Sequence, residues 1–244
     1  MPWTKTQKMI AWGTVVLVAL VVVTLFVCRH RIAGHFVRVS GKRAIADHIV
    51  TPVDLTDRYV VSADRFDTLG TLGWRSVPRW FQVYAHVPFD VNGIICLWGG
   101  RSAKGGLVLP ETDPDIDVHQ KFQTLYVYHA AFFASPANTP VYDVVFHYAD
   151  DSSATNQVLY GADVLDWNVK RSGTAKGPTG ARSRVGWQGG TFTPGKNDPL
   201  RFTVTAIDNP QPYTEVATID LISCKSASAP CILAMTAGKS GLMQ

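Results

Sequence analysis

The stretch TLYVYHAAFFASPANTPVYDVVFHY, residues 124–148, carries the clearest fold signal in this chain. It holds two runs of aromatic and β-branched residues, 124–133 and 141–148, on either side of the turn-forming segment SPANTP. Such runs, bounded by proline and asparagine, are typical of β-strands, and their short spacing predicts that they pair as a hairpin. Both alternating sets of side chains are apolar. This pattern predicts central strands that are buried on both faces, or a sheet whose outer face is covered by loops.

Similar runs continue on both sides of this stretch, from about residue 50 to 236, and alternate with clusters of Gly, Pro, Asn and Asp. Short strands at close, regular intervals predict an all-β sandwich or barrel. A Gly-rich segment, 172–196, is predicted to be a long loop broken by one short strand at 185–188. The other predicted strands are 53–55, 82–87, 91–98, 155–160, 200–207, 216–223 and 232–236.

An uncharged apolar run, MIAWGTVVLVALVVVTLFVC, occupies residues 9–28. At about 1.5 Å per residue, roughly 20 residues cross a hydrocarbon core of about 30 Å. We therefore expect a short tail at 1–8, one transmembrane signal anchor at 9–28, a basic juxtamembrane linker at 29–48 and one β-domain at 49–244. A cleaved signal peptide is the alternative, and the length of the apolar run favours retention.

The charges constrain the partners of the chain. It carries 23 Lys and Arg against 19 Asp and Glu, and much of the excess flanks the apolar run, where basic residues contact anionic lipid headgroups. The remaining β-domain is close to neutral, so no nucleic-acid partner is expected. The higher basic count after the run favours a cytoplasmic β-domain, whereas the short basic start favours export. We expect a single-pass protein of the cell membrane with an exoplasmic domain, and the orientation stays open.

Two cysteines bear on the same question of compartment. Cys224 and Cys231 flank the segment KSASAP between two strand-like runs, so they could face each other across a hairpin. A disulfide there would indicate an oxidising compartment; the alternative is two unrelated thiols. Cys96 is expected to be a small buried hydrophobic residue.

No catalytic motif accompanies these features. The chain has no GxSxG or HExxH motif and no phosphate-binding loop of the expected spacing, so we predict that it is not an enzyme. His129 and His147 lie on consecutive predicted strands and could approach each other, but structural roles are favoured over a zinc site. Acidic loops could hold a structural calcium ion, yet their spacing matches no EF-hand, and we expect no cofactor.

Loop tryptophans are the main binding candidates, because an indole offers a flat face on which a ligand can stack. Trp187 has glycines close by in GWQGG, which predicts an exposed ring, and Trp167 follows a Gly-containing loop. In a carbohydrate site these two rings would stack on sugar faces. Asp163 and Arg182 would form hydrogen bonds with sugar hydroxyls.

Several short blocks, in order, resemble a galactose-binding-like jelly-roll domain found in membrane-anchored proteins of planctomycetes and verrucomicrobia. The blocks are VPFDVNGII at 87–95, LYVYHA at 125–130, HYAD at 147–150 and YGADVLDW at 160–167, and the resemblance covers about 51–238. The chain departs from the family at Asp151, where the family has glycine, and at Asn168, where it has a second tryptophan.

The resemblance implies a jelly-roll β-sandwich of a largely uncharacterised kind. Together with the predicted anchor, it leads us to expect a non-catalytic binding module for carbohydrate at the cell envelope. The alternative is a protein-interaction or structural module in an envelope or sensory assembly. A fold alone does not decide between these two functions.

Overall fold

The structure, a computed structural model, describes residues 42, 43, 45, 47, 49–68, 74–174, 176–191 and 198–243. Within these ranges, no helix combines the length and the apolar character that a membrane crossing requires. The predicted anchor at 9–28 and most of the predicted linker lie outside the described residues.

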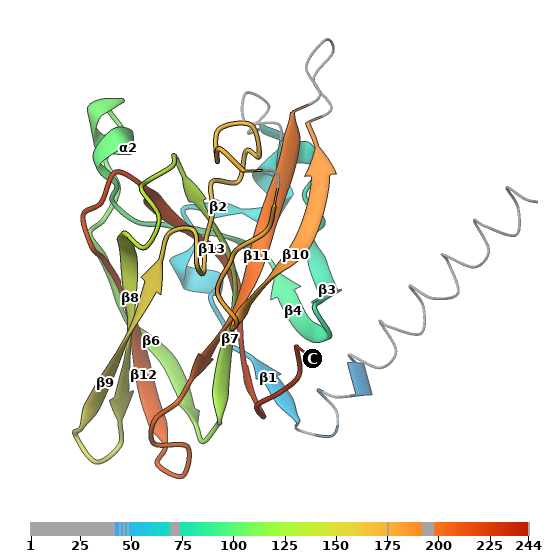
Figure 1. Cartoon of the computed structure of the whole chain (residues 1–244). Helices are drawn as coiled ribbons and strands as arrows, with labels where there is room; N and C mark the ends of the chain where they lie inside the picture. The colour runs from blue at the N-terminus through green and yellow to red at the C-terminus, as the bar shows by residue number, and fades with distance from the viewer. Residues whose placement is uncertain are drawn as a thin grey trace, which may run out of the picture. The chain divides into compact units, whose positions relative to one another are not determined.

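The β-domain consists of two antiparallel sheets packed face to face, which confirms the prediction of an all-β sandwich (Figure 1). The larger sheet has the order β10-β11-β7-β13-β5-β2, with β1 also paired to β13, and the smaller has the order β6-β12-β8-β9. Strands β3 and β4 form a separate pair. The strands are β1 (Val50–Pro52), β2 (Val61–Ser62), β3 (Trp80–Tyr84), β4 (Val87–Val91), β5 (Gly93–Cys96), β6 (Thr112–Gln120), β7 (Thr124–Phe132), β8 (Pro140–Tyr148), β9 (Ser153–Leu159), β10 (Ser183–Gly190), β11 (Pro199–Asp208), β12 (Val216–Ser223) and β13 (Ala229–Gly238).

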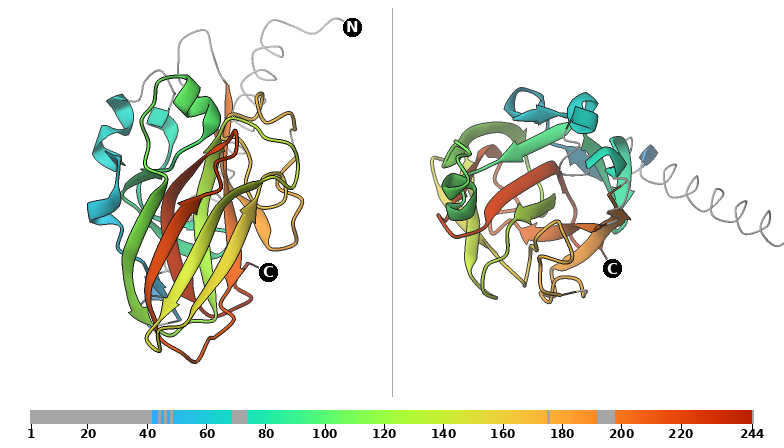
Figure 2. Two further views of the ribbon diagram at one scale, coloured as in Figure 1. Left: turned by 90° about the vertical axis from the view of Figure 1, so that its left-hand side faces the viewer. Right: turned by 90° about the horizontal axis from the view of Figure 1, so that it is seen from above.

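Helical segments are few and short. They are α2 (Gly100–Lys104) and the 3-10 turns η1 (Thr56–Arg58), η2 (Ala63–Thr68) and η3 (Trp74–Ser76). The view from the side in Figure 2 shows the smaller sheet as one twisted layer, with the helical segments gathered near one end of the domain. This arrangement leaves loops at both ends of the sandwich available for binding.

Strand β7 is buried on both faces, as its apolar pattern predicts. Leu125 and Val127 point between the two sheets and pack with side chains of β8 such as Val144. Tyr126 and Tyr128 point to the opposite side, where they belong to a second core formed with η2, η3 and the β3–β4 pair. The covered outer face of the larger sheet therefore explains why both alternating sets of side chains are apolar.

The predicted hairpin between β7 and β8 is wrong. Strand β7 pairs with β11 and β13 in the larger sheet, whereas β8 pairs with β12 and β9 in the smaller one. Residues 133–139 therefore cross from one layer to the other. Sheets pack about 10 Å apart and an extended chain covers about 3.3 Å per residue, so seven residues can make this crossing.

The connection from β12 to β13 makes the same kind of crossing. Strand β12 lies in the smaller sheet and β13 in the larger, so residues 224–228 do not close a hairpin. The predicted facing of Cys224 and Cys231 across a hairpin fails for this reason, and no disulfide joins them in the structure.

The predicted strand at 82–87 contains a tight turn instead. Strands β3 and β4 pair as a hairpin whose two turn residues, Ala85 and His86, have φ angles of 47° and 66°. Two positive φ angles are typical of a type I′ turn, which usually takes Asn-Gly or Asp-Gly. The sequence Ala-His hides the turn from sequence analysis.

The acidic residues at 111–117, one of the predicted acidic loops, mostly form part of edge strand β6 instead. Asp115 and His119 adopt positive φ angles, and the pairing with β12 shifts register twice. Irregular pairing of this kind, with a proline and several carboxylates, is typical of an edge strand.

Candidate functional site

Two of the predicted site residues, Asp163 and Arg182, form a bidentate ion pair. The Arg182 Nε and Nη2 atoms lie 2.9 and 2.7 Å from the two carboxylate oxygens of Asp163. The same carboxylate accepts hydrogen bonds from the Leu159 amide and the Ser183 hydroxyl. Burial works against the charged carboxylate, but these donors outweigh it, and the pKa of Asp163 lies below its usual value. Only 2% of Asp163 is exposed, so the pair ties β10 to the loop after β9.

A chain of hydrogen bonds continues from Asp163 into the sandwich core. The Thr205 hydroxyl donates to the Asp163 carbonyl and lies 2.8 Å from His129 Nε2. On the other side of the imidazole, the Tyr142 hydroxyl lies 2.7 Å from Nδ1. Both ring nitrogens of His129 are therefore satisfied in the neutral form, with Nε2 as donor and Nδ1 as acceptor.

His129 and His147, the two histidines considered for a zinc site, lie in different sheets and have different hydrogen-bond partners. His129 faces the interior from the larger sheet, whereas His147 lies on β8 in the smaller sheet, 2.9 Å from Asp220. In the part of the chain that the structure describes, no three His, Cys, Asp or Glu side chains are grouped as a metal ion would require.

Trp167 lies in the second core and exposes only 3% of its surface. Its ring packs edge-on against Trp74 and Phe132. The guanidinium of Arg171 covers it at 4.8 Å from the ring centroid. A cation over an indole face adds to stability, and here it occupies the face that a sugar would need. Trp167 thus has packing contacts that account for its position.

Trp187 on β10 is half-buried, unlike the exposed ring that its neighbours predicted. A Cβ added at Gly189 would lie 2.2 Å from the indole, so this glycine allows the ring to lie against its own strand. The opposite contact is Phe202, at 5.8 Å between ring centroids. The glycine makes room for packing, and the ring keeps only part of its surface for a ligand.

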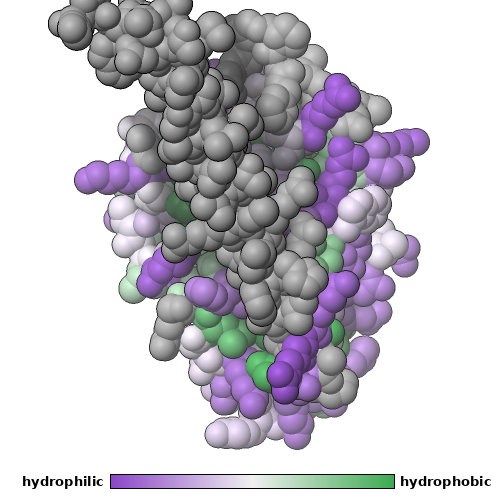
Figure 3. Space-filling view, turned by 90° about the vertical axis from the view of Figure 1, so that its right-hand side faces the viewer, coloured by the Kyte–Doolittle hydropathy of each residue, from purple (hydrophilic) through white to green (hydrophobic). Residues whose placement is uncertain are grey.

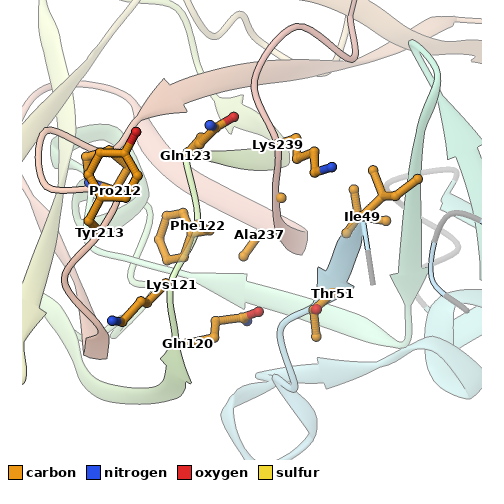
Figure 4. Close-up of a pocket in the computed structure, with 12 residues that line it drawn as sticks. Ile49, Thr51, Gln120, Lys121, Phe122, Gln123, Pro212, Tyr213, Ala237 and Lys239 are labelled. Atoms are coloured by element: carbon orange, nitrogen blue, oxygen red, sulfur yellow. The ribbon is translucent and has the colours of Figure 1, made fainter. Parts of the chain in front are cut away.

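A better-formed candidate site is a hollow of about 230 Å³ at the end of the sandwich where β1 begins (Figure 4). Four segments meet there: the start of β1, the β6–β7 turn, the β11–β12 loop and the end of β13. Enclosed pockets for drug-sized ligands usually measure about 300–1,000 Å³, so this hollow suits part of a larger polar ligand. The residues that line it are Ile49, Val50, Thr51, Gln120, Lys121, Phe122, Gln123, Pro212, Tyr213, Ala237, Gly238 and Lys239.

Tyr213 stands at the rim of this hollow with 84% of its surface exposed. Its loop is held in shape by the buried side chain of Asn209, which donates to the Phe122 carbonyl and accepts from the Tyr148 hydroxyl and the Gln211 amide. A large aromatic side chain on a fixed loop offers a preorganised surface at low entropic cost.

The polar groups of the hollow are two amides and two ammonium groups. The Gln123 side-chain oxygen accepts from the Ser240 amide, which leaves its NH₂ group to donate to a ligand. Lys121 and Lys239 are exposed at the rim, and none of the described lining residues is acidic. The site thus presents donors and positive charge beside an aromatic ring.

The sequence analysis did not identify this site, although the turn-forming segment DNPQP, 208–212, lies beside it. The available signal was an aromatic residue directly after a proline-rich turn, a position that exposes a ring without a core contact. Around the rest of the domain, the face in Figure 3 is mostly hydrophilic where residues are coloured, and its hydrophobic side chains form small groups.

Comparisons with known proteins give no assignment. No protein-family model matches the chain, and no curated protein sequence matches it.

Proposed function

We propose that this β-domain is a non-catalytic carbohydrate-binding module of the galactose-binding-like jelly-roll type. The membrane anchor at 9–28 displays it on the exoplasmic side of the cell envelope. The observation that carries the proposal is the exposed ring of Tyr213 beside the amides and lysines of the hollow.

The chemistry of the hollow suits a saccharide. A sugar ring presents a C–H face that packs on an aromatic ring, and its hydroxyls pair with amide groups such as those of Gln120 and Gln123. Lys121 and Lys239, with no carboxylate among the described lining residues, favour a saccharide that carries acidic groups.

The strand connections support the jelly-roll part of the proposal. Chain crossings between layers, such as those after β7 and β12, are a feature of two-sheet jelly rolls. Within this proposal, Asp163 and Trp167 fix the shape of the domain. Arg182 and Trp187 keep exposed surface for a secondary ligand contact.

Replacement of Tyr213 by alanine in the full-length chain should weaken glycan binding at least tenfold, about 1.4 kcal/mol, because the stacking surface is lost. Tyr213→Phe keeps the ring and should retain most of the affinity. A glycan array followed by titration of the best ligand measures both variants, and Trp80→Ala, at another exposed aromatic residue, serves as a control outside the hollow. Absence of any glycan ligand, or equal affinity in Tyr213→Ala, would refute the proposal.

A protein-interaction module is the second candidate, and a different surface favours it. Leu107 and Val108, just after α2, are 56% and 99% exposed, and α2 lies at the end of the domain away from β1 (Figure 1). Two adjacent exposed aliphatic residues suit a protein partner better than a sugar.

For this candidate, Val108→Asp should abolish co-purification of an envelope protein from solubilised membranes, because a charge would be buried in the interface. Val60→Asp, at another exposed aliphatic position, is the matched control. Quantitative mass spectrometry of the co-purified proteins measures the effect. An unchanged set of partners in Val108→Asp would rule out this surface.

A further inference from the structure

Cys96 and Cys231 are direct partners on neighbouring antiparallel strands, β5 and β13. Their Sγ atoms lie 3.9 Å apart. Both side chains are buried in the second core, beneath the layer that covers the larger sheet. Cys231 has no such relation to Cys224, which directly follows β12 of the other sheet.

The position of Cys96 and Cys231 in the hydrogen-bonding pattern between β5 and β13 decides whether they can form a disulfide. The Leu97 amide donates to the Pro230 carbonyl, so 97 and 230 are a hydrogen-bonded pair, and Cys96 and Cys231 are the adjacent non-hydrogen-bonded pair. Directly opposed residues of that kind have Cα atoms about 4.5 Å apart, within the range of about 4.4–6.8 Å that disulfides span. Side-chain rotation alone can bring the two sulfur atoms to bonding distance.

We propose that Cys96 and Cys231 are joined by a cross-strand disulfide in the functional protein, formed by exchange with a disulfide oxidant while the chain folds. The thiolate of one cysteine attacks the oxidant's disulfide, such as that of oxidised glutathione, and displaces one thiol. The second cysteine then attacks the mixed disulfide and displaces the other thiol. The protein loses two protons and two electrons, and the oxidant gains them as two thiols.

Burial sets the timing of this step. Desolvation and the neighbouring thiol of Cys96 hold the pKa of Cys231 well above its usual value, and only the thiolate is a nucleophile. The exchange therefore precedes closure of the second core. Cys224 is a poor competitor in the folded protein, because burial and the charge of Asp143 raise its pKa to about 12.

The bridge has two consequences. It links residues 135 positions apart and fastens β5 to β13, the strand that also pairs with β7 and β1. A bridge in protein taken from its native cells also places the β-domain in an oxidising compartment, in agreement with the exoplasmic side proposed above.

Trypsin digestion places Cys96, Cys224 and Cys231 on three different peptides, because it cleaves after Lys225, between Cys224 and Cys231. The full-length chain is unfolded in urea and detergent, refolded with oxidised and reduced glutathione, alkylated and digested without reductant. The expected product is peptide 80–101 linked to peptide 226–239. Cys224→Ser is the matched control and should give the same linked pair.

Two results would overturn the proposal. One is a linkage between peptides 202–225 and 226–239, which would show pairing of Cys224 with Cys231. The other is complete alkylation of Cys96 and Cys231 after refolding. A second measurement does not depend on the digest: reduction should lower the midpoint of thermal unfolding of the wild-type chain and of Cys224→Ser, but not that of Cys96→Ala.

Discussion

Replacement of Asp163 by alanine should lower the free energy of unfolding by about 3–5 kcal/mol, because removing one partner of a buried ion pair leaves the other uncompensated. Four donors lose their acceptor: two guanidinium nitrogens of Arg182, the Leu159 amide and the Ser183 hydroxyl. The guanidinium can turn partly toward solvent, and the Ser183 hydroxyl still lies 2.9 Å from Thr205 Oγ1. The Leu159 amide loses the acceptor that Asp163 provides, and an unsatisfied buried donor costs about 1–3 kcal/mol.

Urea unfolding of the full-length chain, followed by tryptophan fluorescence, measures this loss. Asp117→Ala is the matched control, because that aspartate has an 82% exposed side chain and should cost less than about 0.5 kcal/mol. Asp163→Asn keeps the shape and one acceptor oxygen, so its effect should fall between the two. Equal midpoints for Asp163→Ala and Asp117→Ala would mean that the pair does not hold the β9–β10 region in place.

Acid should destabilise the domain well before its carboxylates titrate, because of His129. Burial lowers the pKa of this imidazole from 6.5 to about 3, against the opposing influence of the Asp163 charge. The unfolded chain therefore binds one more proton than the folded one between pH 6.5 and about 3. Stability is complete above pH 6.5 and is lost as the pH falls through this window, by about 2 kcal/mol at pH 5.

The midpoint of urea unfolding is measured at pH 7.5 and at pH 5 for each variant. The difference between the two midpoints measures the stability lost in acid, whatever the stability of that variant at pH 7.5. His129→Gln cannot take up the proton, so its pH difference should shrink by about 2 kcal/mol even if the variant is less stable at pH 7.5. The lowered pKa of Asp163 acts only below about pH 4, outside this comparison. The same pH difference in His129→Gln and wild type would show that the imidazole is not held neutral.

The residues allowed most strands to be predicted, but not their partners. Strands such as β12 follow directly from apolar runs between turn residues, and the predicted and observed limits are both 216–223. Pairing could not be read in the same way. The seven-residue connection at 133–139, with one proline, fits a hairpin loop and a crossing between layers equally well. Only the packing of Val144 against the facing sheet decides between them.

The candidate site was less predictable, because residue type does not reveal what covers a side chain. Small neighbours predicted an exposed ring for Trp187, but Gly189 lets the indole lie against its own strand. Trp167 is covered by Arg171, four residues later in the sequence. The hollow near Tyr213 depends on four segments that are distant in sequence. Local sequence patterns do not show which distant segments come together in the fold.

The place of β13 in the larger sheet has a consequence for biosynthesis. This strand separates β7 from β5 and pairs with β1, yet it follows every other described strand of the domain in the sequence. The larger sheet cannot assemble until translation has passed residue 238, and pairings between distant segments form slowly. The nascent β-domain, which lacks this central strand until then, stays unfolded until residue 238 has been made. That is the state in which a polypeptide can be threaded through a translocation channel.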